Sequence, residues 1–217
     1  MDKEINQIEI ATAYIDILLE TGKPPTSVYN LCKALEIDES FFYKHFSSFE
    51  HLEKKIFILF FENAITVLEK NKDFTTYDSK NKLLSLYFTY VEILTQNRSF
   101  VLLSLDNNKN ALKNIKKLEG LKKVFNEFIS DLHIDKIDFK QEKIEKIQDK
   151  GIQEGFWVQF LLILKFWMDD TSSSFEKTDI FIEKSVHASF DLINTKPVKS
   201  ILDLGKFLLK EKMDYKY

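Results

Sequence analysis

The sequence predicts an all-α protein, and three observations support that prediction. Glycine and proline are scarce, with five and three residues in a chain of 217, and this scarcity favours long helices over tight turns. Apolar residues recur at spacings of three and four, which place them on one face of a helix. Runs of β-branched residues with a period of two, which would indicate strands, are missing.

The composition also limits the class of protein. The single cysteine, Cys32, rules out a disulfide within the chain and suits a reducing compartment, so we expect a cytoplasmic protein. The N-terminus has no basic start followed by an apolar run, and we expect no signal peptide. The densest apolar stretch, residues 156–168, is interrupted by Gln159 and Lys165. It is too short to cross a bilayer, so we expect no membrane association.

Two helices are predicted at the start of the chain. The first covers about residues 3–20 and ends at Gly22, because glycine readily terminates helices. Its expected apolar face consists of Ile8, Ala11, Ile15, Leu18 and Leu19. After the KPP stretch, Thr26 or Ser27 should cap a short second helix that runs to Leu35.

A short third helix is predicted at about residues 39–46, with Asp38 as its cap. Phe42 and Phe46 are four residues apart and therefore share one face, which we expect to be buried. The rest of the segment remains for another contact: Ser40, Phe41, Tyr43, Lys44 and His45. Two short helices joined by about three residues, behind a longer first helix, describe a three-helix DNA-binding unit. We therefore expect the third helix to lie between a protein core and a nucleic acid.

The rest of the chain is predicted to be helical as well. Ser47 with Glu50, and Ser173 with Glu176, have the spacing of capping boxes, which open helices. The first of these boxes opens a helix that continues to about residue 70. Further helices are expected at about 79–96, 98–105, 109–132, 141–168 and 175–194, with a last amphipathic helix after Pro197. The loops are short, so neighbouring helices should pack antiparallel.

Residues 8–65 resemble the tetracycline-repressor-like (TetR) family of transcriptional regulators. The resemblance rests on TSVYNLCKALEIDESFFYKHFSSFEHL, and within it FFYKHFSSFEHL follows the family pattern closely. It implies that Tyr43 contacts a backbone phosphate. Thr26 and Ser27 would offer phosphate a hydroxyl and helix N-terminal amides. The residues that would face the groove are Phe41, Lys44 and His45.

Several positions depart from the family pattern. The family usually has a small residue, often glycine, in place of Glu36, and a lysine that touches phosphate in place of Phe49. Tyr29 stands where a basic residue is frequent and is a further candidate DNA contact. Residues 1–52 carry four lysines, no arginine and nine acidic residues, a net charge of −5. Neutralised phosphates supply most nonspecific DNA affinity, so an alternative stays open: a helical interaction protein that kept the fold and lost DNA binding.

Asp38 and Glu39 allow two interpretations. At the start of a helix, acidic side chains usually act as caps and dipole partners. In a major groove, a carboxylate at Glu39 can instead accept a hydrogen bond from a cytosine amino group. His45 is likewise either a DNA contact, which we favour, or an ordinary surface histidine.

No catalytic or metal site is predicted. His51, His133 and His187 have no metal-ligand spacing with one another or with the cysteine. A Ser–His–Asp set, a phosphate-binding loop and an HExxH motif are all missing from the sequence, so we expect neither an enzyme nor a cofactor. Asp169 and Asp170 resemble an acid pair, but their position in a capping loop favours solvated side chains over acid–base chemistry.

The predicted dimer contact uses residues 152–168 and 175–194. Both segments carry more apolar surface than one side of a helix can bury, so a two-fold, four-helix contact should cover it. The family resemblance also implies that two helices pair across a dimer. The residues expected there are Trp157, Leu161, Leu164, Phe181, Val186, Phe190 and Ile193.

An apolar ligand pocket is expected among the helices between residues 79 and 168. Aromatic residues at spacings of three and four are most simply core residues, yet together they can line a cavity for a small apolar ligand. The candidates are Tyr87, Phe88, Phe100, Phe125, Trp157 and Phe160. In this hypothesis residues 1–48 read double-stranded DNA at a palindromic operator, most simply as a repressor. Residues 49–217 form the ligand-responsive, dimerising domain.

Overall fold

Every regular element in the described part of the chain is a helix, so the predicted all-α fold is confirmed. The computed structural model describes residues 6–105, 115–135 and 142–193. The chain divides into two compact units. The first comprises Met1–Val67 and Thr89–Val124, and the second comprises Leu68–Phe88 and Phe125–Tyr217.

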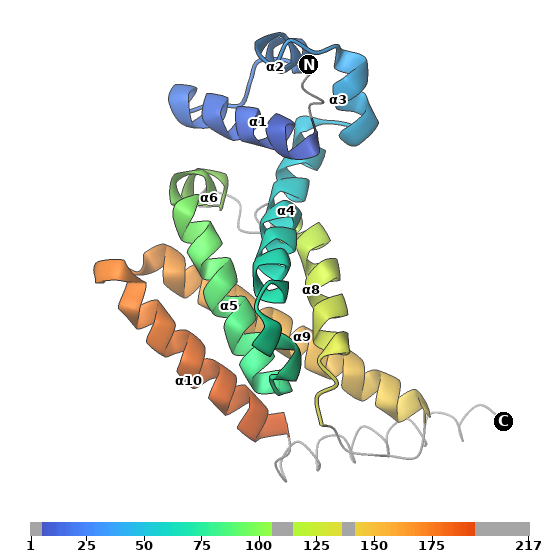
Figure 1. Ribbon diagram of the computed structural model, residues 1–217, viewed down its shortest axis with the longest axis vertical. Helices are drawn as coiled ribbons and strands as arrows, with labels where there is room; N and C mark the ends of the chain where they lie inside the picture. The colour runs from blue at the N-terminus through green and yellow to red at the C-terminus, as the bar shows by residue number, and fades with distance from the viewer. Residues whose placement is uncertain (1–5, 106–114, 136–141, 194–217) are drawn as a thin grey trace, which may run out of the picture. The chain divides into compact units, whose positions relative to one another are not determined.

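The helices of the described residues occupy nearly the segments predicted from the sequence (Figure 1). Two short 3-10 helices, labelled η, were not predicted. The first helices are α1 (Gln7–Thr21), α2 (Val28–Ala34), α3 (Glu39–His45) and α4 (Phe49–Glu69). The later elements are η1 (Lys72–Thr76), α5 (Ser79–Gln96), α6 (Arg98–Leu105), α8 (Glu119–Asp131), α9 (Glu142–Asp169), η2 (Ser173–Phe175) and α10 (Glu176–Ile193). The bounds predicted for α5 and α6 are confirmed. The predicted stretch 109–114 and the helix after Pro197 lie outside the described residues.

Helices α1 to α3, which we call the head, enclose a small core within the first unit. Its buried side chains are Ile10, Ala11, Tyr14, Leu18, Leu31, Cys32, Phe42 and Phe46. The rings of Phe42 and Phe46 lie 5.6 Å apart, so the predicted inward face of α3 is confirmed. The predicted face of α1 is partly wrong, because Ile8 and Leu19 are exposed. The buried line of α1 instead follows Ile10, Tyr14 and Leu18 at intervals of four residues.

The predicted capping box at α4 is displaced by one residue. The Ser48 hydroxyl, not that of Ser47, accepts a hydrogen bond from the His51 backbone N–H at 3.1 Å. The Ser47 backbone N–H in turn donates to His51 Nδ1 at 3.2 Å, while Glu50 forms an ion pair with Lys54 at 3.2 Å. The spacing favoured Ser47, because Glu50 lies three residues after it, but the hydroxyl that accepts from the start of α4 is that of Ser48.

In the second unit, the start of α10 is organised by Asp170 and not by the predicted Ser173–Glu176 pair. One carboxylate oxygen of Asp170 accepts from the Ser172 backbone N–H (2.8 Å) and hydroxyl (2.7 Å). The other accepts from the Thr178 backbone N–H (2.9 Å) and hydroxyl (2.7 Å). Four donors to one carboxylate fix the loop that turns from α9 into α10.

The two neighbouring aspartates therefore have different environments. Asp169 is exposed and pairs with Lys165 at 2.6 Å, as a solvated side chain can. Asp170 is buried, so the expectation that both are solvated is wrong for this residue. Burial by itself would raise the pKa of Asp170, but the hydrogen bonds from Thr178 and Ser172 hold that pKa well below its usual range.

Candidate functional site

Helix α3 exposes four of the side chains predicted to contact DNA. With Phe42 and Phe46 in the core, the rest of the helix leaves these four open to solvent: Ser40, Tyr43, Lys44 and His45. Tyr43 is 53% exposed, so its phenol is available to a partner. Hydroxyl, ammonium and imidazole groups are the donors that proteins direct at phosphate oxygens and base edges.

Phe41, the fifth predicted residue of α3, is half-buried and supports two of the exposed ones. Its ring lies 5.2 Å from the imidazole of His45. The Lys44 ammonium lies 5.8 Å from the centroid of the same ring, which is within the range of a cation–π contact. An aromatic platform of this kind restricts the positions of the two polar groups.

The first turn of α3 carries negative charge. Asp38 occupies the predicted N-cap position, but its side chain makes no capping hydrogen bond. The prediction is therefore correct for the position of the cap and wrong for its contact. Glu39 follows in the first turn, half-buried.

The buried thiol of Cys32, on α2, is affected by these two carboxylates. Burial raises the pKa of the Cys32 thiol, and the Glu39 and Asp38 carboxylates raise it further, which disfavours a reactive thiolate.

The N-terminus of α2 places the other three candidates at the surface. Ser27 is the N-cap, and its hydroxyl accepts from the Asn30 backbone N–H at 3.2 Å. The Asn30 side-chain amide donates to the Thr26 hydroxyl, so both hydroxyls are held by Asn30 and keep their own hydrogens for a further acceptor. Tyr29 is 57% exposed and extends from the same turn.

Two departures from the family pattern have visible structural roles in the first unit. Glu36, in the turn between α2 and α3, has a φ of 57°, the left-handed region in which glycine avoids the strain imposed by a Cβ. Phe49 is half-buried, with its ring 5.3 Å from that of Tyr14 and 5.9 Å from that of Phe42. The position where the family has a phosphate-contacting lysine thus contributes to packing in this protein.

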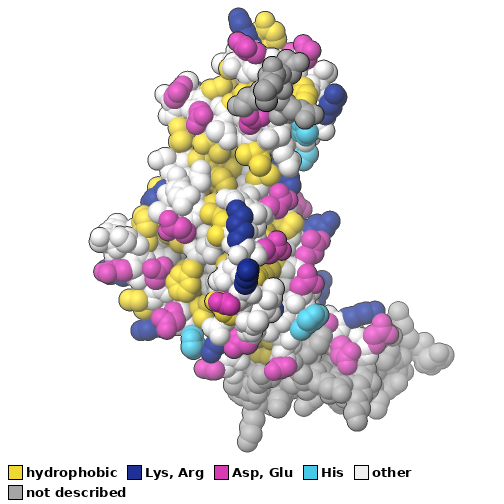
Figure 2. Space-filling view, viewed as in Figure 1, with side chains coloured by type: hydrophobic (Ala, Val, Ile, Leu, Met, Phe, Trp, Pro, Cys, Tyr) yellow, Lys and Arg dark blue, Asp and Glu magenta, His cyan; other side chains and the backbone are white. Residues whose placement is uncertain are grey.

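The sequence of the head and of the residues that flank it is acidic. Residues 1–52 have a net charge of −5, and Figure 2 shows acidic side chains scattered among polar and apolar ones over the head. The lysines of the described part of this segment are Lys23, Lys33 and Lys44, all exposed. Few cations are therefore available on the head to neutralise phosphates.

Four of the six predicted ligand residues form one aromatic cluster inside the second unit. These four, which we call the aromatic cluster, are Tyr87, Phe125, Trp157 and Phe160, and all are buried. Phe125 is central, with ring centroids 6.1 Å from Tyr87, 5.8 Å from Trp157 and 5.3 Å from Phe160. The sequence pattern suggested that these residues could act together, and the structure brings them together.

A buried polar pair adjoins this cluster. The Tyr87 hydroxyl lies 3.2 Å from Gln159 Oε1 and 3.3 Å from the Phe156 carbonyl oxygen, and can donate to either. Gln159 Nε2 donates to the Ser189 hydroxyl at 3.0 Å. Gln159 was not among the predicted ligand residues, although a lone polar residue within an apolar stretch was a signal that could have identified it. Burial raises the pKa of Tyr87, so its phenol stays protonated as a donor.

The other two predicted ligand residues do not belong to this cluster. Phe88 is 38% exposed. Phe100 belongs to the first unit, where its ring lies 5.9 Å from Phe57 and 6.2 Å from Phe60. The aromatic cluster therefore excludes these two residues.

Two surface depressions lie in the second unit and share Ile134 and Asp135. The larger has a volume of about 420 Å³ and is lined by Ile129, Ser130, His133, Ile134, Asp135, Asp149, Ile152 and Gln153. The smaller, about 300 Å³, is lined by Asp78, Ser79, Lys80, Ile134, Asp135, Phe190, Asp191 and Ile193. Neither is lined by any of the six predicted ligand residues, and the location of a ligand site stays a prediction.

Helices α9 and α10 lie side by side in the second unit and expose aliphatic side chains (Figure 1). The most exposed are Val158, Leu162, Ile180 and Leu192, which are 53%, 56%, 49% and 56% exposed. Phe166 and Phe181 stack across the two helices with centroids 4.6 Å apart. We call this set the α9–α10 surface.

The residues predicted for this surface were partly wrong. Trp157, Leu164 and Val186 are buried within the protomer, because they lie on the faces of α9 and α10 that pack inward. Residues one position along the helix, such as Val158, point outward instead. The prediction of surplus apolar surface holds for the two helices, with different side chains supplying it.

Metal-binding and membrane-spanning features are missing from the described part of the chain. No group of three or more His, Cys, Asp or Glu side chains there is arranged to hold a metal ion. None of the helices there combines the length and apolar character needed to span a membrane.

Comparisons with known proteins identify the family. The family model for the tetracyclin repressor-like C-terminal domain matches residues 82–208. Among solved structures, the TetR family transcriptional regulator PfmR from Thermus thermophilus is 16% identical, with a TM-score of 0.41, over 80% of this chain and 94% of its own. A regulatory protein in the tetR family from Rhodococcus RHA1 is 15% identical, with a TM-score of 0.41, over 86% of this chain and 96% of its own.

A search of curated proteins finds no match. The matched family model covers more than half of the chain, and it lies entirely beyond the sequence resemblance at residues 8–65. The two stretches of sequence therefore indicate the same family from opposite ends of the chain. The chain belongs to the tetracyclin repressor-like (TetR) family of transcriptional regulators.

Proposed function

We propose that this regulator is a homodimeric repressor that binds a palindromic operator through α3 and responds to a small apolar ligand. The observation that carries the proposal is the division of α3 into two faces. Phe42 and Phe46 are buried, while Tyr43, Lys44 and His45 are exposed. A short helix anchored by two rings, with donors on its open side, suits the major groove.

The proposal assigns residues 1–48 to DNA binding and residues 49–217 to dimerisation and ligand response. In a dimer, the two heads would contact two half-sites, and the α9–α10 surface would meet its own copy across a two-fold axis. The ligand would bind near the aromatic cluster, where Tyr87 and Gln159 supply the polar contacts. It would favour one spacing of the heads and operator DNA another, and that difference would couple the two sites.

The DNA-binding test begins with fragments of the source genome selected by the purified protein. Tyr43→Phe removes one hydroxyl per subunit and should weaken every bound sequence alike, by roughly tenfold in a dimer. His45→Ala should relax the preference at one position per half-site, by about 1–3 kcal/mol. Tyr77→Phe, the same change outside the head, is the matched control and should leave binding unchanged.

Salt dependence tests the source of the affinity. Because the head offers few lysines, the slope of log affinity against log salt should be shallow for a dimeric helix-turn-helix protein. A steep slope would mean phosphate contacts outside the head. Lys54 and Lys55, at the start of α4, would then be the first residues to substitute.

The second candidate function is a helical interaction protein that no longer binds DNA. The net charge of −5 over residues 1–52 favours it, as does the packing role of Phe49 in place of a lysine. In this case no genomic fragment would bind even at low salt. The Tyr43 and His45 variants would then behave as the unmodified protein does in every assay.

A named probe can test the ligand site before the natural ligand is known. Anilinonaphthalene sulfonate should bind close to the aromatic cluster and quench the emission of Trp157. Gln159→Leu, which removes the buried polar partner of Tyr87, should change the affinity for the probe. An unchanged affinity, with the probe bound elsewhere, would move the proposed ligand site to another part of the chain.

A further inference from the structure

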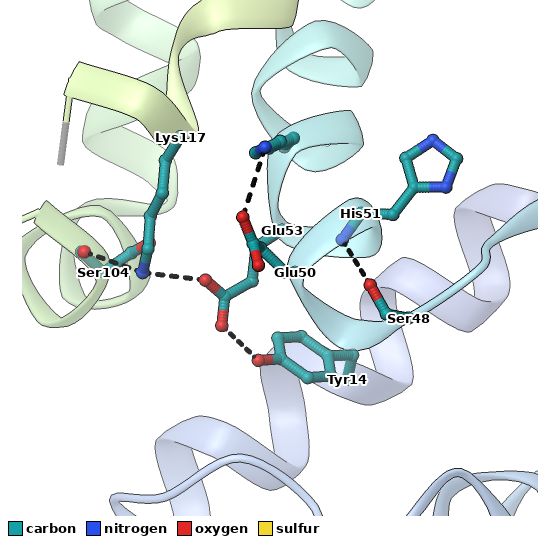
Figure 3. Close-up of polar contacts among 8 residues, drawn as sticks. Tyr14, Ser48, Glu50, His51, Glu53, Ser104 and Lys117 are labelled. Carbon is teal, nitrogen blue, oxygen red and sulfur yellow. Dashed lines mark hydrogen bonds and ion pairs between the residues drawn. The ribbon is translucent and has the colours of Figure 1, made fainter. Parts of the chain in front are cut away.

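Four side chains of the first unit form a continuous polar network between the head and the helices beside it (Figure 3). The Tyr14 hydroxyl on α1 donates to Glu53 Oε1 on α4 at 2.5 Å. Glu53 Oε2 pairs with Lys117 Nζ at 2.7 Å. Lys117 Nζ also donates to the Ser104 carbonyl oxygen at 3.1 Å and lies 3.3 Å from its hydroxyl. We call this network the Glu53 clamp.

The clamp is sheltered from water. Tyr14 is fully buried, and the side chains of Glu53 and Lys117 are only 15% and 24% exposed. Charged groups that are partly removed from water interact more strongly than an exposed pair, provided that their remaining hydrogen bonds are satisfied. Burial, together with the hydrogen bond to Glu53 and its charge, raises the pKa of Tyr14 well above its usual range, so the phenol stays a donor.

The clamp adds polar contacts to the apolar packing between the head and the helices beside it. The head also touches α4 through the rings of Tyr14 and Phe49, 5.3 Å apart. Phe49 and Glu53 are one turn apart on α4 and therefore share a face. Apolar burial is largely non-directional, whereas the polar contacts of the clamp, which join four residues in series, each require a particular geometry. Ser104 extends this constraint to the last turn of α6.

The other ion pairs of α4 provide a contrast. Lys54 pairs with Glu50 at 3.2 Å, and Lys55 pairs with Glu62 at 2.8 Å. Both pairs lie within the one helix, so neither can set the orientation of another element. Glu53 differs in that its carboxylate bonds residues from two other parts of the chain.

We propose that Glu53 is a positioning residue, and that its clamp with Tyr14, Lys117 and Ser104 fixes the angle of the head relative to α4 and α6. In a dimer, that angle determines the distance between the two α3 helices and hence the half-site spacing that is bound. The effect on half-site spacing rests on the proposed function, because it requires DNA binding. The effect on the angle of the head rests only on the contacts of the clamp and holds whether or not the protein binds DNA.

The structural test measures the angle without DNA. In the full-length Cys32→Ala protein, spin labels at Ala34→Cys on α2 and Ser99→Cys on α6, both at exposed positions, report a head-to-α6 distance. Labelled chains are diluted with unlabelled ones, so that only distances within a chain are seen. Glu53→Gln and Lys117→Met should each at least double the width of the distance distribution. Lys117→Arg keeps the positive charge, so the distance distribution of this variant should stay as narrow as that of the parent protein.

The control for this test is Glu62→Gln, the same substitution on the same helix in a pair that stays within α4. It should leave the distribution as narrow as in the parent protein. Equal widths for Glu53→Gln and Glu62→Gln, with both proteins folded, would overturn the proposal.

The DNA test uses the selected operator with its half-sites moved apart or together by one base pair. The parent protein should discriminate between these spacings, and Glu53→Gln should reduce that discrimination at least threefold. Simple destabilisation lowers the active fraction and weakens binding to all spacings equally, so it leaves the ratio of their affinities unchanged. An unchanged ratio in Glu53→Gln would therefore contradict the proposal. If the parent protein binds no DNA, the proposed function fails, while the distance measurement still decides the clamp.

Discussion

The exposed surface of α3 and the α9–α10 surface both present large side chains to solvent, but of opposite chemistry. On α3 the exposed groups end in a hydroxyl, an ammonium and an imidazole, at Tyr43, Lys44 and His45. On α9 and α10 they end in methyl groups, as in Leu162 and Ile180. A polar surface loses little when it is left in water, whereas aliphatic side chains gain from being covered.

This difference indicates two kinds of partner. The α3 side chains are suited to a charged polymer whose edges carry hydrogen-bonding groups. The α9–α10 side chains are suited to another apolar surface, and a second copy of the same helices is the simplest one available. We expect each surface to be specified by its exposed residues and supported by its buried ones, and substitutions of both kinds can test this.

The largest effect is expected from the buried side of α3. Phe42→Ala removes a fully buried ring and should lower the free energy of unfolding by about 3–5 kcal/mol, as should Phe46→Ala. Tyr43→Phe keeps the ring and should change stability by less than about 0.5 kcal/mol. Urea denaturation of the three variants checks this, and similar losses at residues 42 and 43 would contradict the two-faced description of α3.

The next effect concerns the α9–α10 surface. Leu162→Glu places a carboxylate on each side of the proposed two-fold contact and should weaken dimerisation by roughly 100-fold, about 2.7 kcal/mol. Leu103→Glu, an equally drastic change at an exposed leucine of α6, should leave association unchanged. Sedimentation velocity over a concentration series separates the two, and a monomeric parent protein would remove this interface altogether.

A smaller effect is expected at the loop that leads into α10. Asp170→Asn weakens the hydrogen bonds to Ser172 and Thr178 and should lower the denaturation midpoint, whereas Asp169→Asn should leave it within error. The pKa of Asp170 is lowered in the folded state, so its contribution is complete above the unfolded-state pKa of about 3.9. It is lost as the pH falls through the lower folded-state pKa. A stability difference from Asp170→Asn that instead vanished between pH 6 and 8 would contradict this assignment.

The smallest effect is expected from the turn before α3. Glu36→Gly relieves a left-handed residue and should stabilise the protein by about 0.5–1 kcal/mol, after the entropy cost of glycine is subtracted. Glu36→Ala removes the same charge but keeps a Cβ, so it should give no such gain. Differential scanning calorimetry compares them, and equal gains would show that charge, not backbone strain, is the cause.

Much of the fold followed from local sequence. The bounds of α5 and α6, the inward rings of α3 and the helix-ending Gly22, with its φ of 68°, all depend on residues close together in the chain. The capping boxes were harder, because the local signal, Ser47 with Glu50 three residues later, indicated a different serine from the one that contacts α4, Ser48.

The candidate sites were less predictable, because they depend on contacts between distant segments. Glu53 and Lys117 are ordinary charged residues of amphipathic helices, and nothing local indicates that they meet. The buried role of Asp170 was missed because its donor Thr178 lies eight residues further on. By contrast, the pattern of α3 was visible because one short segment carries both its buried rings and its exposed donors.

The placement of the two tryptophans has a consequence for optical measurements. Trp157 and Trp167 are the only tryptophans of the chain, and both are buried on α9. Trp157 stacks on Phe160, with centroids 5.2 Å apart. The head contains tyrosines but no tryptophan. Emission excited at the red edge of protein absorption therefore originates in the second unit alone and provides a label-free signal from α9. The head contributes no tryptophan emission, so following it by fluorescence requires an added fluorophore.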